Sequence, residues 1–150
     1  MESLKVMNKI RKYRLDPYGH LVIVKLKNIK QYGILKDKTY FTEKAHTYIL
    51  YTVLLYNGGS YKKRLLRATE FDVVKIYDYD DIYLRKNVRK DRLDPKKKLI
   101  VVDTITQHIG VLLSKFRKEN TIIFEIDCCE EDNYIIECKT GQFNVIDIIE

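Results

Sequence analysis

The sequence predicts a mainly β protein built from two tandem five-stranded units, and three observations lead to this prediction. Short apolar runs rich in Val, Ile, Leu and Tyr alternate with turn-forming residues, as is typical of β proteins. The pair Asn57-Gly58 lies between two such runs and fits a tight type I′ hairpin turn, in which both central residues need positive φ. The runs also recur in the same order along the chain, so each half is expected to form the same unit.

The repeat begins with an identical tetrapeptide. Arg14-Leu15-Asp16-Pro17 recurs as Arg92-Leu93-Asp94-Pro95, and a strand-like run follows each copy at the same distance. Three later runs match in order: Tyr32–Leu35 with Gly110–Leu113, Tyr48–Val53 with Thr121–Ile126, and Phe71–Ile76 with Phe143–Ile148. The offset between the copies shrinks by about six residues, and we expect the losses in loops, about five in 37–46 and one at the hairpin turn, because loops tolerate length changes.

The elements follow in order. Residues 1–13 are expected to form a short basic helix or arm, 14–77 the first unit, 78–91 a charged linker and 92–150 the second unit. One segment allows an alternative. Apolar residues in 104–117 lie at helical spacing, so an α+β fold with a helix there is the second possibility. Gly110 and the repeat alignment favour a loop and a strand instead.

Each unit resembles an SH3-like small barrel of the Tudor, KOW or Agenet sort. The segments that carry the resemblance are GHLVIVKL, YGIL, YTVLLYNGG and ATEFDVVKI, which together describe five short strands, a tight hairpin and a brief turn before the last strand. It is a resemblance of architecture, and it implies a non-catalytic binding module.

Charge is spread unevenly along the 150 residues. The net charge is +7; residues 1–120 carry +14 and residues 121–150 carry −7. Residues 14–77 have a net charge of +7 and residues 92–149 a net charge of −2. A basic first unit favours a polyanionic partner. No run of about 20 apolar residues occurs, so we expect no membrane association and a cytoplasmic, intracellular location. The bias toward Ile, Lys and Tyr is compatible with an AT-rich phage, viral or plasmid source.

Nucleic acid is therefore the first ligand class that the sequence indicates, DNA or RNA. Basic side chains would neutralise phosphates, and interleaved tyrosines would stack on bases. The basic candidates are Lys62, Lys63, Arg64, Arg67, Arg85, Lys86, Arg89, Lys90, Lys96, Lys97 and Lys98. The stacking candidates are Tyr32, Tyr51 and Tyr61.

A protein partner is the alternative, because the acidic second unit could dock a basic protein or the basic unit of another copy, as an adaptor or inhibitor. A minor alternative is a metal-dependent nuclease, since Asp127 and Glu137-Cys138-Lys139 resemble the D…ExK core of PD-(D/E)xK nucleases. Pairing Asp127 with Asn133 would separate the two carboxylates by roughly 13 Å along the strands, too far for one metal. Under that pairing Glu125, Asp127, Glu137 and Lys139 face water, and Ile122, Phe124, Ile126 and Cys138 face the core.

Cysteine and histidine patterns indicate no cofactor and no metal. Cys128, Cys129 and Cys138 are an odd number, include an adjacent pair and lack a CxxC spacing, so we expect free thiols. The sequence has no Gly-rich phosphate loop and no recognisable nucleophile with an ordered His and acid. We therefore expect binding and not catalysis.

Overall fold

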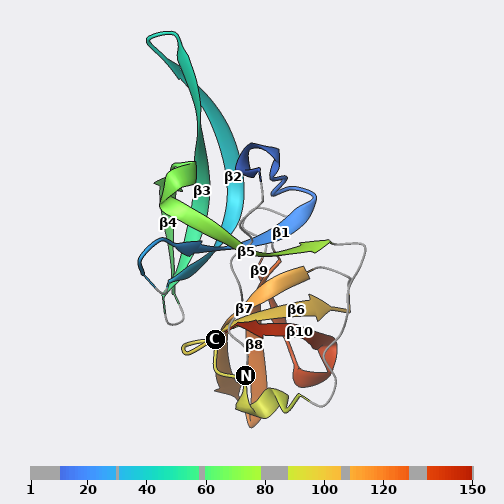
Figure 1. Ribbon diagram of the computed structural model, residues 1–150. Helices are drawn as coiled ribbons and strands as arrows, with labels where there is room; N and C mark the ends of the chain where they lie inside the picture. Colours follow the sequence, from blue (N-terminus) through green and yellow to red (C-terminus); the bar gives the residue numbers. More distant parts are fainter. Residues whose placement is uncertain are drawn as a thin grey trace. The chain divides into compact units, whose positions relative to one another are not determined.

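The computed structural model describes residues 11–29, 31–57, 60–78, 88–105, 109–128 and 135–149, except the side chains of Asn57, Ser60 and Tyr61. Within these residues the protein is mainly β and forms two compact units, each with one five-stranded antiparallel sheet (Figure 1). The prediction of two repeated five-stranded β units is thus confirmed.

The first sheet has the strand order β4-β3-β2-β1-β5. Its strands are β1 (His20–Leu26), β2 (Tyr32–Glu43), β3 (His46–Asn57), β4 (Ser60–Leu66) and β5 (Phe71–Asp78). Two 3₁₀ helices complete the unit, η1 (Lys12–Arg14) before β1 and η2 (Ala68–Glu70) before β5. Strands β3 and β4 are neighbours, as the Asn57-Gly58 signal predicted; Gly58 and Gly59 lie outside the described residues.

The second sheet repeats this order as β9-β8-β7-β6-β10. Its strands are β6 (Leu99–Thr104), β7 (Ile109–Lys118), β8 (Thr121–Cys128), β9 (Ile135–Cys138) and β10 (Phe143–Ile149). The 3₁₀ helices recur in the same places, as η3 (Lys90–Arg92) and η4 (Thr140–Gln142). Residues 109–117 are strand, so the alternative of a helix over 104–117 is wrong for this part of it.

Irregularities in pairing recur at equivalent positions and give the strongest evidence for duplication. The β1–β5 register shifts next to Val24, and the β6–β10 register shifts next to Val102, 78 residues later. The β2–β3 register shifts after Leu35, and the β7–β8 register shifts after Leu112, 77 residues later. β-Bulges bend and twist a sheet locally, so the two sheets are curved at the same points.

The positions of Gly33 and Gly110 in the two sheets change the predicted alignment of the repeat, which matched Tyr32 with Gly110. Val24 pairs with Gly33 and Val102 pairs with Gly110, so the two glycines are equivalent and not shifted by one place. The reason is a close approach of the next strand. A Cβ atom on Gly110 would lie 2.2 Å from the carbonyl oxygen of Asp127, and one on Gly33 would lie 2.8 Å from that of Leu54.

Most of the length difference lies in a strand hairpin and not in a loop, contrary to the prediction for 37–46. Phe41 pairs with Tyr48 in the first unit, and Lys118 pairs with Thr121 at the equivalent point in the second. The first hairpin then continues through Thr42–Thr47 and Glu43–His46 before it turns. Figure 1 shows this hairpin extending beyond the rest of its sheet. Exposed strand pairs at a hairpin tip lie away from the core, so the two hairpins can differ in length while the sheets keep the same order.

Each unit packs its own core around one aromatic pair. Tyr51 meets Phe71 edge to face at 5.1 Å between centroids, and Phe124 meets Phe143 in the same way at 4.8 Å. Edge-to-face packing is the favourable arrangement for such rings. Val88 packs against the second core, so the second unit takes in part of the predicted linker. Residues 1–10 and 79–87 lie outside the described residues, so the N-terminal helix and most of the linker stay predictions.

The shared Arg-Leu-Asp-Pro tetrapeptide has a structural reason at three of its four positions. Leu15 and Leu93 are buried in the two cores, and both prolines are buried. Asp16 accepts hydrogen bonds from the backbone N–H groups of Tyr18 and Gly19, and Asp94 accepts one from that of Lys96. An aspartate that bonds the backbone two residues on stabilises a turn. The two arginines are exposed.

Candidate nucleic-acid interface

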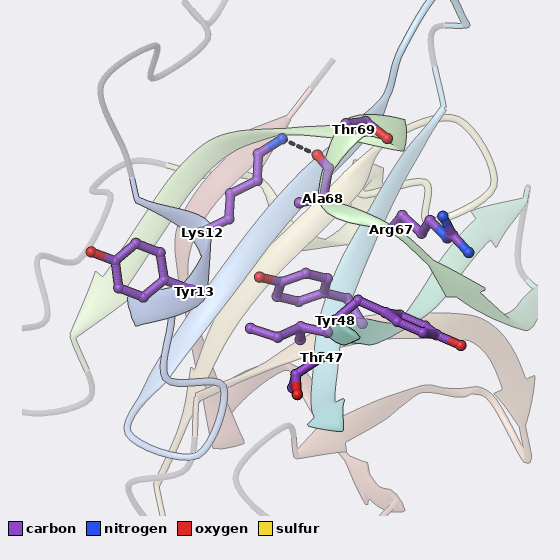
Figure 2. A pocket seen from close by; sticks show the side chains of 9 residues that line it. Lys12, Tyr13, Thr47, Tyr48, Arg67, Ala68 and Thr69 are labelled. Atoms are coloured by element: carbon purple, nitrogen blue, oxygen red, sulfur yellow. Dashed lines mark hydrogen bonds between the residues drawn. The ribbon is translucent and has the colours of Figure 1, made fainter. Parts of the chain in front are cut away.

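A pocket of about 570 Å³ opens on the first unit, where η1 and η2 face the start of β3 (Figure 2). Its lining includes three tyrosines and two cations and contains no carboxylate. The lining residues are Lys12, Tyr13, Thr47, Tyr48, Ile49, Tyr51, Arg67, Ala68 and Thr69. The groove that these residues form is called the tyrosine groove below.

Lys12 fixes one wall of the tyrosine groove. Its ammonium donates hydrogen bonds to the backbone carbonyls of Ala68 and Phe71 and lies 4.7 Å from the centroid of the Phe71 ring. These contacts hold η1 against the turn that precedes β5. Burial lowers the pKa of Lys12, and the nearby charge of Lys27 adds to this effect.

Two tyrosines of the groove, Tyr13 and Tyr48, each have an arginine near the ring, and of the two arginines Arg67 lines the groove while Arg14 does not. The Arg14 guanidinium lies 5.7 Å from the Tyr13 ring, and that of Arg67 lies 5.0 Å from the Tyr48 ring. Tyr48 also stacks on Phe41, with the centroids 5.9 Å apart and the planes 20° apart. Figure 2 shows Tyr13 at one end and Tyr48 with Arg67 at the other. Tyr48 thus already contacts Arg67 and Phe41, while Tyr13 is 52% exposed.

Tyr51 lies between these ends and belongs to the core. It is 1% exposed, so it cannot serve as the exposed stacking surface that the sequence predicted. Burial raises the pKa of its phenol, with a smaller contribution from Tyr40. The phenol therefore stays protonated at neutral pH, and Tyr51 is among the residues that line the groove.

The second unit keeps the scaffold of the groove and its two basic positions, and it lacks the tyrosines. By strand register, Asp91 stands at the position of Tyr13, Thr121 at that of Tyr48 and Phe124 at that of Tyr51. Lys139 stands where the first unit has Arg67, in each case one residue before the 3₁₀ helix that precedes the last strand. The two copies thus differ most where the first has tyrosines, and that difference marks the groove as a candidate site.

The predicted basic residues of the first unit are exposed but do not form one patch. Lys62 and Arg64 alternate with Lys63 along β4, and Leu66 on the side of Lys62 and Arg64 is buried in the core. Because side chains alternate across a strand, Lys63 lies on the other side, with the exposed Leu65. Arg67 follows the strand and belongs to the tyrosine groove.

Lys90 makes contacts within the second unit, and its role as a phosphate ligand stays a prediction. Its ammonium donates hydrogen bonds to the carbonyls of Thr140, at 2.7 Å, and Phe143, and lies 4.9 Å from the Phe143 ring. Arg89 is exposed and forms an ion pair with Asp91 at 3.6 Å. Lys96, Lys97 and Lys98 are exposed, while Arg85 and Lys86 lie outside the described residues.

Of the predicted stacking residues, only Tyr32 has a described side chain that is partly exposed. Tyr61 lies on β4, and its side chain is outside the described part. The sequence analysis missed Tyr13 and Tyr48, the aromatic residues that line the groove with arginine partners. Only the comparison of the two copies could have found them, because both positions are aromatic in one copy and small or charged in the other.

The C-terminal carboxylates pair in a register different from the predicted one. Asp127 pairs with Ile135 and Glu137 with Glu125, so Asp127 and Glu137 lie two residues apart along the strands, roughly 7 Å and not 13 Å. Asp127 is buried and not exposed as predicted. The described residues contain no cluster of three His, Cys, Asp or Glu side chains able to hold a metal ion. Cys128 and Cys138 are buried free thiols, as expected, and Cys129 lies outside the described residues.

No protein-family model matches the chain, and no curated protein or solved structure is similar enough to show a relationship. Among the described residues, no helix has the length and apolar character needed to span a membrane.

Proposed function

We propose that the first unit binds single-stranded nucleic acid in the tyrosine groove. The observation that carries this proposal is one open groove lined by Tyr13, by Tyr48 and by Arg67, with an arginine near each of the two tyrosine rings. A base stacked on an aromatic side chain contributes about 1–3 kcal/mol to binding, and arginine beside it supplies charge for the phosphates. The same combination is typical of surfaces that bind unpaired strands.

The chemistry of the groove disfavours other ligands of similar size. A cationic ligand would meet Lys12 and Arg67 and no carboxylate in the lining. Duplex nucleic acid keeps its bases stacked inside the helix and would leave the tyrosines unused. An unpaired strand can use the aromatic faces and the charges together. Strand β4 adds positive charge to the first unit, with Lys62 and Arg64 exposed on one side of the strand and Lys63 on the other.

An SH3-like barrel remains the architecture that we propose for each unit. The strand order, the bulges and the 3₁₀ helix before the last strand support it. A binding module of this kind, from a phage, virus or plasmid, is the interpretation that the composition favours.

Fluorescence anisotropy with labelled single-stranded and duplex DNA and RNA, at about 50 and 200 mM salt, tests the proposal. We expect the single strands to bind more tightly than the duplexes. Tyr48→Leu keeps apolar packing and removes the ring, and Arg67→Ala removes the charge. Each should weaken single-strand binding roughly tenfold. Thr121→Ala and Lys139→Ala make the matched changes in the second unit and should leave binding as in the wild type.

Equal binding of duplex and single strand, with no effect of Tyr48→Leu, would contradict the groove and point to unspecific charge attraction. Absence of binding at the lower salt concentration would favour a protein partner, and a pull-down at moderate salt would follow. Inclusion of Mg²⁺ tests the nuclease alternative, because cleavage lost in Glu137→Ala would show a metal site that involves this carboxylate.

A further inference from the structure

A second opening, of about 460 Å³, lies wholly on the second unit between the turn after η3 and strand β7. Arg92, Lys96 and Lys115 contribute three cations to its lining, and Asp94 contributes the one carboxylate. Ser114 adds a hydroxyl group between Leu113 and Lys115. Cations therefore outnumber acids three to one among the lining residues, and a further carboxylate, that of Glu125, lies 2.6 Å from the Ser114 hydroxyl.

Several of these groups are held in place by described hydrogen bonds. The carboxylate of Asp94 accepts a bond of 3.0 Å from the backbone N–H of Lys96. The ammonium of Lys115 donates to the carbonyl of Asp91 at 2.9 Å, which uses one of its three protons. The hydroxyl of Ser114 donates to Glu125 at 2.6 Å. The turn, the ammonium and the serine are thus positioned before any ligand binds.

The first unit carries a different arrangement at the equivalent place. Tyr18 stands where the second unit has Lys96, and Asp37 stands where it has Ser114. The hydroxyl of Tyr18 donates a hydrogen bond to the carboxylate of Asp37. That pair joins the turn to strand β2 and places a negative charge there. In the second unit a hydroxyl group replaces this acid and an ammonium group replaces the phenol, while the carboxylate stands on the paired strand, as Glu125 in place of Thr52.

We propose that the opening on the second unit binds a phosphate group. A phosphate offers several oxygen acceptors around one compact centre, so it can bond to cations that approach from different sides. Arg92 suits a bidentate contact because its guanidinium presents donors in a planar fork. Lys96 and Lys115 would act as point charges beside it. This site is separate from the tyrosine groove, and its existence does not depend on the function proposed for that groove.

Titration with inorganic phosphate, followed by the backbone amide signals of the intact chain in nuclear magnetic resonance, tests the proposal. We expect saturable shifts at Lys96, Ser114 and Lys115 that equal ionic strength of sodium chloride does not produce. In the first unit Asp37 pairs with Thr52, whereas position 114 pairs with Glu125, so Arg92→Met removes a cation of the site without adding a carboxylate beside Glu125 and should weaken phosphate binding. The double variant Lys96→Tyr with Ser114→Asp introduces the tyrosine and the aspartate of the first unit. It should weaken phosphate binding at least tenfold, since charge-assisted hydrogen bonds are lost and a carboxylate is added.

Shifts that chloride reproduces, or that persist unchanged in the double variant, would overturn the proposal. The source of the phosphate is tested with two otherwise identical oligonucleotides, one with a 5′-phosphate and one with a 5′-hydroxyl. Tighter binding of the phosphorylated strand, with the difference lost in the double variant, would identify a strand end as the ligand. Equal binding of the two strands, with the phosphate shifts intact, would assign the site to phosphate that does not come from a strand end.

Discussion

The ammonium of Lys12 lies over the ring of Phe71, 59 residues later in the chain, and donates to the carbonyl of the same residue. Lys90 and Phe143 repeat this relationship in the second unit. In both copies one lysine ties the first turn of the unit to the turn before its last strand. A second lysine supports the same first turn, since Lys38 bonds the carbonyls of Tyr13 and Leu15 and Lys115 bonds that of Asp91. Both units therefore close with lysines donating to backbone carbonyls.

Replacement of Lys12 by Met should destabilise the first unit by about 1–3 kcal/mol, because two charge-assisted hydrogen bonds and a cation–π contact are lost. Lys90→Met should do the same to the second unit. Hydrogen exchange of the β5 and β10 amides separates the two effects. Lys63→Met, at an exposed position, should change stability by no more than about 0.5 kcal/mol. Equal effects of all three variants would show that the contacts with the carbonyls contribute nothing.

The difference in stability between wild type and Lys12→Met should change with pH in one direction. Burial lowers the pKa of Lys12 below the ordinary 10.5, so just below pH 10.5 the unfolded chain binds more protons than the folded one. The stability that wild type has over Lys12→Met should therefore increase as the pH rises toward 10.5. Urea unfolding of both proteins between about pH 8 and 10.5 measures the difference. A decrease over this range would mean that the carbonyls outweigh desolvation and raise the pKa instead.

Tyr51→Phe should leave stability within about 0.5 kcal/mol of wild type, because Phe124 fills the equivalent place in the second core. Single-strand binding should weaken roughly two- to tenfold, which corresponds to one lost hydrogen bond. Thermal unfolding and anisotropy measure the two quantities. Unchanged affinity would remove the phenol of Tyr51 from the binding site while leaving Tyr48 and Arg67 in it.

Removal of Thr42, Glu43, His46 and Thr47 should be tolerated. It would leave Phe41 and Tyr48 flanking the Lys44-Ala45 turn, as Lys118 and Thr121 flank Glu119-Asn120. Both turns have positive φ at their two central residues. Residues 39–47 are exposed, so little packing is lost and the midpoint of thermal unfolding should stay close to that of wild type. A large loss of cooperativity would show that the hairpin tip supports the sheet.

Gly110→Ala should destabilise the second unit by about 2 kcal/mol or more, because the new Cβ would meet the Asp127 carbonyl oxygen at 2.2 Å and the backbone would have to move. Gly141→Ala is the matched control. Nothing lies within 4 Å of a Cβ there, so stability should be unchanged or slightly higher. Chemical unfolding of both variants makes the comparison, and similar losses would contradict the close approach at Gly110.

The sequence alone predicted much of the fold, because strands and turns are local. Period-two alternation correctly placed Phe124, Ile126 and Cys138 in the core even though the β8–β9 register was wrong by two residues. A shift of two keeps every side chain on its side of the sheet and changes only the distances along it. The predicted distance between Asp127 and Glu137 along the strands was therefore too long, although both residues were placed on the correct strands.

The parts that the sequence did not predict depend on contacts between distant segments. In the sequence, nothing distinguishes Lys90 from an exposed lysine, and only the fold brings it to Phe143. Asp127 alternates with core residues, yet alternation does not say whether the other side of a strand is open to water. Tyr13 and Tyr48 are 35 residues apart, and their common groove arises only when η1 packs beside β3.

The shared strand order and bulge positions also have a consequence for how the chain acquires its structure. Each strand of one unit could pair with the neighbour of its counterpart in the other unit, because the strand order and the bulge positions are the same. Such incorrect pairing competes with correct pairing when both units are unfolded at the same time. Differences such as Leu55 against Cys128 in the cores reduce that competition. Synthesis from the N-terminus reduces it further, because the first unit can fold before the second has left the ribosome. During refolding from denaturant both units are unfolded at the same time. We therefore expect refolding to yield more dimers in which two chains have exchanged strands than synthesis in a cell does.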